Sequence, residues 1–326
     1  MKRNLILIHR GAPYERDFAE IGRKAVALDR DIDVYAIGMD SKSQLPPAIW
    51  QRPTLVVAFA GKFNLRIKRG KLLKNVPIDK LLQYEIFRKA GIPTPPTLAF
   101  KFGMMLDPLL FGEFALVKPM DLNLTSRGDG VQLFRRRRIE QLRLHDFPPD
   151  HPLHRDRQGY LVQRFVDTGL YPSFQRVETL FGKILYSWHS TLQSPRCALD
   201  APDAEIERTI IATQGGDKDR KLVKEPDILA LAEKVHGAFA SIPLLAIDVL
   251  REQNTGKLYV LECNPGGNTW HFSSQIGAKL RLGFGNATVN GEKRAHEIAR
   301  QMFIDQYGAF DIAAKALVEQ THAHAS

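Results

Sequence analysis

The first 75 residues alternate between short apolar runs and a helical pattern. Leu5–Ile8, Val34–Ile37 and Leu55–Phe59 are continuous apolar segments, and residues 14–28 repeat apolar side chains at helical spacing. Continuous apolar strands with helices between them are typical of a parallel sheet covered on both faces. The pattern therefore predicts a small α/β unit. It has no G-x-G-x-x-G turn, which disfavours a dinucleotide site.

The rest of the chain predicts an α+β arrangement. A helix is predicted over 78–89, with an apolar stripe through Leu82, Ile86 and Ala90, and it stops at Gly91 before Pro93. Further predicted elements are strands at 114–119 and 160–166, a strand pair turning at Gly182, a polar loop over 193–224, and helices over 227–241 and 291–320, followed by a disordered tail with His322 and His324.

The segment Ala246–Thr269 predicts a hairpin. Two apolar runs, 247–250 and 258–261, flank Asn254-Thr255-Gly256, which is a turn signal. If the turn centres on Thr255, Asp248 lies opposite Glu262. Because strand side chains alternate between faces, Asn264 points the same way as Glu262.

Asp248, Glu262 and Asn264 would then place two carboxylates and an amide oxygen on one face. Opposed carboxylates repel each other unless a cation lies between them. Hard oxygen donors in this number suit Mg²⁺, which completes its shell with water and nucleotide phosphates. An exposed polar hairpin face explains the same residues without a metal, and a one-residue register slip would separate them.

A lysine closes one apolar strand and is followed by a small-residue loop. Lys118 follows Phe114–Val117 and precedes Pro119, and residues 126–130 read Ser-Arg-Gly-Asp-Gly. A lysine ammonium suits a phosphate as a point charge, and backbone N–H groups in such loops form anion-binding nests. A plain hairpin turn is the alternative for the loop.

Asp248, Glu262 and Asn264 on a late hairpin resemble the metal-binding signature of the ATP-grasp superfamily, and the ordered set of motifs extends this resemblance over nearly the whole chain. The resemblance implies an ATP-grasp fold, combining α/β and α+β parts. A small Rossmann-like N-terminal domain over 1–76 would precede two α+β lobes, over 77–165 and 166–326, that clamp ATP.

The resemblance also implies residue roles. Asp248, Glu262 and Asn264 would bind Mg²⁺, with Mn²⁺ as an alternative, and Arg176 and Lys118 would act in catalysis. ATP would be bound by Lys101, Lys118, Ser126, Gly128, Gly130, Gln163, Arg164, Phe165 and Val166. Lys80 is the alternative to Lys101 as a second phosphate lysine. His9 and Arg10 are candidates for the acceptor substrate.

One departure concerns residue 246. D-alanine-type ligases carry an arginine two residues before the first metal aspartate, and this chain has Ala246 there. The activity implied is an ATP-dependent carboxylate–amine ligase that forms an acyl phosphate and releases ADP and phosphate. A kinase of the same fold acting on a small anionic alcohol, and a nucleotide-binding protein without turnover, remain alternatives.

Charge and composition limit the classes of molecule that the protein is expected to bind. The net charge is +10, and basic residues cluster in 62–74 and 135–138. Without a nucleic-acid-binding motif, these clusters favour a solvated face or an anionic small molecule over nucleic acid. There is no apolar run long enough for a membrane span. Two cysteines favour a reducing, cytoplasmic location. We expect small-molecule acid and amine substrates; a homodimer stays open.

Overall fold

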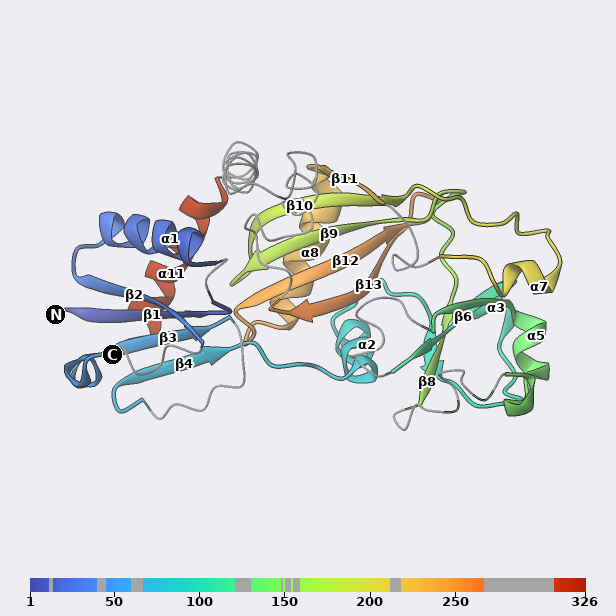
Figure 1. Ribbon diagram of the computed structural model, residues 1–326, viewed down its shortest axis with the longest axis horizontal. Helices are drawn as coiled ribbons and strands as arrows, with labels where there is room; N and C mark the ends of the chain where they lie inside the picture. Colours follow the sequence, from blue (N-terminus) through green and yellow to red (C-terminus); the bar gives the residue numbers. More distant parts are fainter. Residues whose placement is uncertain are drawn as a thin grey trace.

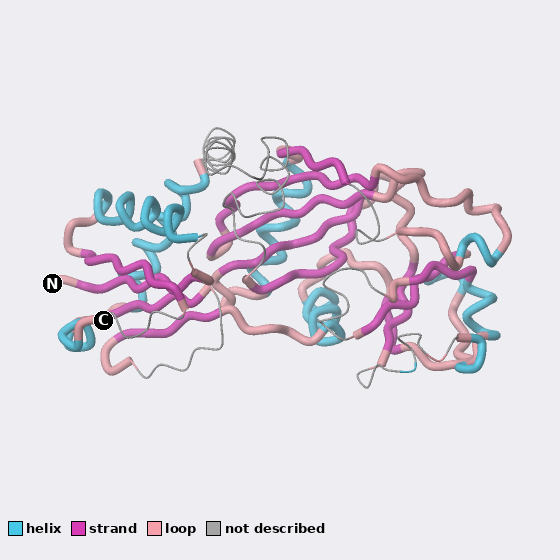
Figure 2. The backbone as a smooth tube through the Cα atoms, viewed as in Figure 1, coloured by secondary structure: helices cyan, strands magenta, loops and turns pink. Residues whose placement is uncertain are grey.

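The computed structural model describes residues 1–11, 14–39, 45–59, 67–120, 130–147, 149, 154, 159–211, 218–266 and 308–326. Three sheets follow one another along the long axis of the molecule (Figures 1 and 2). The N-terminal sheet lies at one end, a five-stranded sheet in the middle, and a smaller sheet at the other end. This mixed α/β architecture confirms the expected fold class. The domain boundaries at 76 and 165 remain predictions.

The N-terminal sheet is parallel, in the order β2-β1-β3-β4. Its strands are β1 (Arg3–His9), β2 (Ile32–Gly38), β3 (Thr54–Ala58) and β4 (Gly70–Lys74). The first three confirm the predicted strands. The sequence did not predict β4, because its only apolar residues are Leu72 and Leu73, with a lysine on each side. In the sheet these two leucines lie beside Val56 and Val57.

Helices from both ends of the chain cover one face of this sheet. Helix α1 (Glu15–Leu28) packs there beside α11 (Ala309–His324), and the short helix η3 (Pro47–Gln51) contributes to the core on the other face. The prediction of a disordered tail at His322 and His324 was wrong, because both belong to α11, and His322 Nε2 lies 2.8 Å from the Asp29 carboxylate.

The smaller sheet is antiparallel, in the order β5-β8-β6-β7. The elements of this region are α2 (Lys80–Lys89), β5 (Thr97–Ala99), α3 (Pro108–Phe111), β6 (Phe114–Pro119), β7 (Gln132–Arg135), α5 (Arg136–Gln141), η4 (Leu144–Asp146) and β8 (Tyr160–Arg164). The strand predicted at 114–119 is confirmed as β6, and the strand predicted at 160–166 is confirmed as β8, which ends at Arg164.

Helix α2 begins where the Asp79 carboxylate accepts hydrogen bonds from Leu81 and Leu82 N–H, and it ends before Gly91, whose φ is +60°. The helix is confirmed. Of its predicted apolar stripe, Ile86 and Ala90 pack against the core, but Leu82 does not. The buried face carries Lys80, Gln83, Tyr84 and Phe87, whereas Leu82 is 48% exposed. The apolar pattern misled because polar residues of α2 face the interior.

The five-stranded sheet is antiparallel, in the order β11-β10-β9-β12-β13. Its elements are β9 (Ser173–Leu180), β10 (Lys183–Leu192), α7 (Asp203–Ile206), β11 (Lys218–Leu222), α8 (Pro226–Ala238), β12 (Leu244–Arg251) and β13 (Leu258–Pro265). Residues 193–224 were predicted as a loop, but they contain α7 and β11. Apolar side chains of α8 and α2 form one core with β12 and β13.

None of the helices described is long and apolar enough to cross a membrane.

Candidate functional site

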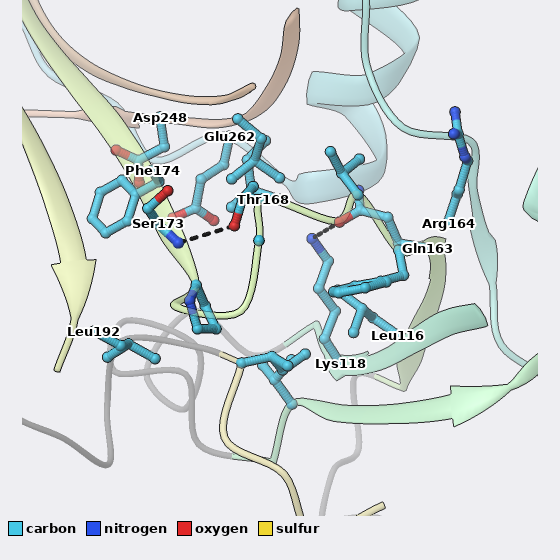
Figure 3. A pocket seen from close by; sticks show the side chains of 18 of the residues that line it. Leu116, Lys118, Gln163, Arg164, Thr168, Ser173, Phe174, Leu192, Asp248 and Glu262 are labelled. Atoms are coloured by element: carbon cyan, nitrogen blue, oxygen red, sulfur yellow. Dashed lines mark hydrogen bonds between the residues drawn. The ribbon is translucent and has the colours of Figure 1, made fainter. Parts of the chain in front are cut away.

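A cavity lies between the smaller sheet and the face of the five-stranded sheet that carries Arg176 and Asp248 (Figure 3). Charged side chains line one part of it: Lys80, Lys118, Arg176, Asp248 and Glu262. Apolar side chains line another part: Leu116, Phe165, Val166, Phe174, Leu192, Ile211 and Leu250. Such a division suits a ligand with a planar apolar end and an anionic end.

The predicted Asp248–Glu262 pair is present in the hairpin, for a reason that the sequence did not show. Arg251 pairs with Leu258 and Val249 with Val260, so the turn centres one half-residue earlier than expected. A β-bulge at Leu261 then shifts the register, and Asp248 lies opposite Glu262. The bulge also lets Leu261 and Glu262 both line the cavity.

Strand β13 is the edge of its sheet in the described chain, and α2 holds that edge. Tyr84 Oη donates to the Leu261 carbonyl at 2.9 Å, and Gln83 Oε1 accepts from Cys263 N–H at 3.0 Å. These two bonds flank Glu262, so the buried polar face of α2 fixes the strand segment that presents this carboxylate.

Asp248 and Arg176 form a buried, two-pronged ion pair. Arg176 Nε and Nη2 each donate to one Asp248 oxygen at 2.6 Å, the geometry of a strong charge-assisted pair. Burial raises the pKa of Asp248 above its ordinary value, while Arg176 opposes that rise. The guanidinium also lies 5.8 Å from the ring centres of both Phe174 and Trp188. Arg176 is therefore held firmly at the charged part of the cavity.

Glu262 lies among cations. Its Oε2 is 3.9 Å from Lys80 Nζ, and its Oε1 accepts from Asn264 Nδ2 at 3.1 Å. Burial alone would raise the pKa of Glu262, but Lys80, Lys118, Asn264 and Arg176 together hold it below its ordinary value. Glu262 is therefore ionised at neutral pH.

Lys118 is buried in the cavity wall and held by two side chains. Its Nζ donates to Tyr84 Oη and to Gln163 Oε1, both at 2.9 Å (Figure 3 shows the second bond). Gln163 Nε2 also donates to Tyr84 Oη at 2.9 Å. Burial lowers the pKa of Lys118 to about 8, with Glu262 acting in the opposite direction. A bound anion would restore the charge that burial disfavours.

Tyr84 therefore connects Lys118, Gln163 and the bulge at Leu261. We expect Tyr84→Phe to lower stability by about 2 kcal/mol, because it leaves the Leu261 carbonyl and Gln163 Nε2 each short of one bond. Urea unfolding measures this loss. The same variant is expected to bind ATP roughly 10-fold more weakly, since Lys118 loses one of its two anchors. Unchanged stability would mean that the three bonds contribute nothing.

The segment from Gln163 to Val166 lies beside the apolar lining. The Gln163 side chain belongs to the Lys118 network, and Arg164 donates to Glu252 at 2.5 Å and to Tyr259 at 2.9 Å, so it ties the hairpin tip instead of facing the cavity centre. The Phe165 N–H donates to Phe114. The Val166 N–H has no hydrogen bond to another described residue, which leaves it available to a ligand.

The other predicted site residues are placed as follows. Lys101 is exposed and does not line the cavity, whereas Lys80 does, and is buried. Gly130, with φ +73°, precedes Val131 of the lining. Ser126 and Gly128 lie outside the described residues. Sequence reasoning missed Tyr84 and Gln83, because an apolar pattern does not show that polar residues of this helix face the interior.

No protein-family model and no curated protein matches this sequence. Solved structures do match. D-cycloserine synthetase DcsG is 15% identical, with a TM-score of 0.48 over 92% of this chain and 99% of that chain. The ATP-grasp ligase PsnB, complexed with a precursor variant, Mg and ADP, is 13% identical, with a TM-score of 0.48 over 97% and 98%. D-alanine–D-alanine ligase from Bacillus anthracis is 11% identical, with a TM-score of 0.43 over 94% and 99%.

Proposed function

We propose that this protein is an ATP-dependent carboxylate–amine ligase of the ATP-grasp type. The observation that carries the proposal is the charged row at the cavity. Asp248 and Glu262 face each other there, with Arg176, Lys118 and Lys80 around them, beside an apolar slot. This arrangement supports binding of a nucleotide triphosphate with its base in the slot and its phosphates at the row.

The oxygen donors fit a divalent cation. Asp248 and Glu262 are opposed, and Asn264 donates through Nδ2 to Glu262. No other described residue donates a hydrogen bond to Asn264 Oδ1, which is therefore available as a ligand. Two carboxylates and an amide oxygen form the hard donor set that Mg²⁺ prefers. Asp248, Glu262 and Asn264 would hold the ion, and Mn²⁺ suits the same set. When bound, the ion would neutralise charge on the β- and γ-phosphates.

The chain's own cations would hold the phosphates in place. Lys118 approaches from the smaller sheet, and Lys80 approaches from α2. A substrate carboxylate would attack the γ-phosphorus, forming an acyl phosphate and releasing ADP. The amine nitrogen would then attack the acyl carbon, and the C–O bond to phosphate would break. Arg176, fixed by Asp248, would offset negative charge in both steps, so catalysis is mainly positioning and charge neutralisation.

The test is the simultaneous measurement of ADP and free phosphate from Mg-ATP over a panel of carboxylic acids, amines and polyol phosphates. Equal release of both products, dependent on an acid and an amine together, is the expected result. ADP without free phosphate would replace the ligase by a kinase. ATP binding without either product, over the whole panel, would overturn the proposal in favour of a nucleotide-binding protein.

The basic run 135–138 supports a small-molecule function over nucleic-acid binding. Arg135 lies 2.6 Å from Asp203, Arg136 lies 2.7 Å from Glu140, and Arg138 lies 3.2 Å from Glu207. Three of these arginines are therefore neutralised within the chain. Weak, salt-sensitive DNA binding is expected at most.

A further inference from the structure

A second polar row crosses the five-stranded sheet next to the charged row. In the pairing register, Tyr186, Glu178, Ala246 and Asn264 lie side by side on β10, β9, β12 and β13. Trp188, Arg176, Asp248 and Glu262 form the neighbouring row. Residues two apart on a strand share a face and lie about 7 Å from each other. Glu178 therefore shares the face of the charged row, one step towards the N-terminal domain.

Glu178 is completely buried and lacks a counterpart. Its relative exposure is 0%, and neither carboxyl oxygen has a hydrogen-bond partner among the described residues. Burial raises the pKa of this carboxyl to about 8, although Arg176 acts to lower it. A buried, unpaired carboxyl costs several kcal/mol in general and persists where something else compensates for it.

The cations nearest to Glu178 are engaged elsewhere or remain at a distance. Arg176 places both of its donor prongs on Asp248. Arg10, at the carboxyl end of β1, acts on Glu178 through charge alone, without an ion pair, and its side chain is exposed. Across β12, Ala246 offers only a methyl group. No cation of the described chain therefore forms an ion pair with Glu178.

Glu178 does not extend the proposed metal site either. No three His, Cys, Asp or Glu side chains within the described ranges come close enough together to hold a metal ion. Glu178 thus stands apart from the Asp248–Glu262 pair, although all three carboxylates share one face.

The Glu178 row lies at the junction with the N-terminal sheet. Asn75 Oδ1 accepts from Leu244 N–H at 3.2 Å, and its Nδ2 donates to the Phe59 carbonyl at 3.3 Å, which ties the end of β3 to the start of β12. The tips of β1 and β3 point towards β12 (Figure 1). The carboxyl ends of parallel strands are where open sheets bind ligands. The row thus lies beside an expected ligand position and next to the cavity lined by Arg176, Asp248 and Glu262.

A second buried group at this junction, the His9 side chain, also lacks a described hydrogen-bond partner at one of its polar atoms. His9, at the end of β1, accepts from Gly11 N–H through Nδ1 at 3.2 Å, so its proton is on Nε2. His9 Nε2 has no partner in the described part of the chain. An acceptor and a donor, both buried and both lacking partners, thus lie on the two sides of the junction.

We propose that Glu178 binds the positively charged amino group of the amine substrate, next to the reaction centre at Arg176, Asp248 and Glu262. This inference rests on the proposed ligase function. ATP and the carboxylic acid are both anionic, and their phosphate and carboxylate groups offer no hydrogen-bond donor to the Glu178 oxygens. The amine is the one cationic reactant, and an ammonium supplies the N–H donors that both Glu178 oxygens lack. Glu178 then accepts one ammonium proton, which leaves a neutral amine whose lone pair attacks the acyl carbon. Glu178 therefore selects a cationic amine over a neutral nucleophile.

The experiment compares the wild type, Glu178→Gln and Glu178→Asp in phosphate release, at saturating Mg-ATP and acid. The varied nucleophile is either a cationic primary amine or hydroxylamine, which is uncharged in neutral solution. We expect Glu178→Gln to raise the KM for the primary amine roughly 10- to 100-fold and to leave the KM for hydroxylamine and for ATP within about 2-fold. Glu178→Asp, which keeps the charge, is expected to lie between the two.

Asp219→Asn is the matched control. It makes the same acid-to-amide change on β11 of the same sheet, but Asp219 is exposed and pairs with Thr191, whose side chain alternates away from the Glu178 face. An unchanged amine KM in Glu178→Gln, or an equal rise for hydroxylamine, would overturn the inference and leave the ligase proposal intact.

A measurement without turnover separates the two proposals. If the wild type releases no phosphate with any acid and amine, the ligase proposal fails by itself. The midpoint temperature of thermal unfolding, measured with added ethylamine, ethanolamine or lysine, then tests whether Glu178 binds an amine. A rise that is present in the wild type and absent in Glu178→Gln supports a cation subsite. Equal behaviour of the two proteins overturns it. Without amine, Glu178→Gln is expected to unfold no earlier than the wild type, because it removes an unpaired buried acid.

Discussion

Glu262→Gln is expected to lower turnover by at least about 1,000-fold, which corresponds to roughly 4 kcal/mol of transition-state stabilisation. The change removes one of two opposed carboxylates from the charged row, so the proposed cation site loses a charged ligand. Lys80, 3.9 Å away, also loses its counter-charge. Turnover is measured as phosphate release from Mg-ATP with the acid and amine found in the panel.

The fold should survive this substitution. Glutamine has the shape of glutamate and can still accept from Asn264 Nδ2, so the unfolding free energy should fall by about 2 kcal/mol at most. Glu225→Gln is the control, because Glu225 pairs with Arg251 of the same hairpin at 2.8 Å and does not line the cavity. Near-normal turnover in Glu262→Gln, with the control also active, would remove Glu262 from the proposed metal site.

Lys118→Met is expected to weaken ATP binding about 100-fold, the size of one charge-assisted phosphate contact. The same change should stabilise the ligand-free protein at neutral pH. Burial lowers the pKa of Lys118 from 10.5 to about 8, so the charged form costs about 3 kcal/mol in the folded state. Removing the lysine removes this cost, but the variant also loses the hydrogen bonds to Tyr84 and Gln163. Their loss reduces the net stabilisation by roughly 1–2 kcal/mol. Weaker binding with higher stability would identify Lys118 as a functional residue.

The pH dependence follows from the direction of this shift. Between pH 8 and 10.5 the unfolded chain binds the Lys118 proton and the folded protein has released it. The contribution of Lys118 to stability therefore rises with pH across this window and is at its least favourable below pH 8. Urea unfolding of the wild type and Lys118→Met should show that the stability advantage of the variant shrinks as pH rises and reverses by about pH 10.5, because only the two lost hydrogen bonds then distinguish the proteins. Subtracting the variant removes the contributions of Tyr84 and Cys263, whose pKa values burial raises.

Lys183→Met provides the control for the loss of one lysine, since Lys183 is exposed on β10. It should change neither ATP affinity nor the pH profile. A constant difference between wild type and Lys118→Met at every pH would mean that Lys118 is not buried with a lowered pKa.

Local sequence patterns predicted most elements correctly where one physical rule decided them. Apolar runs gave β1, β2, β3 and β6, and Gly91 marked the C-terminal end of α2. The rules failed where tertiary contacts outweighed local pattern. The buried face of α2 contains Lys80 and Gln83, because these side chains serve the cavity and the edge of β13. A hydrophobic pattern by itself assigns such residues to the solvent.

For the candidate site, too, the sequence predicted some features and tertiary contacts decided others. The chemical types at Lys118, Arg176, Asp248, Glu262 and Asn264 are visible in the sequence, and strand alternation puts the last two on one face. Lys101 illustrates the limit: its residue type fits a phosphate, but it lies exposed outside the cavity, while Lys80 lines it. A lysine's type does not reveal which way its strand or helix turns.

The sequence by itself determined the alternation of strands and helices, the position of the late hairpin and the identity of its oxygen donors, because these follow from side-chain type and short-range periodicity. Only the tertiary structure decided the bulge that brings Asp248 and Glu262 together, the Tyr84–Lys118–Gln163 network, and the unpaired state of Glu178. Each of these depends on contacts between segments far apart in the chain, and the free energy of such contacts is set by packing and burial in three dimensions.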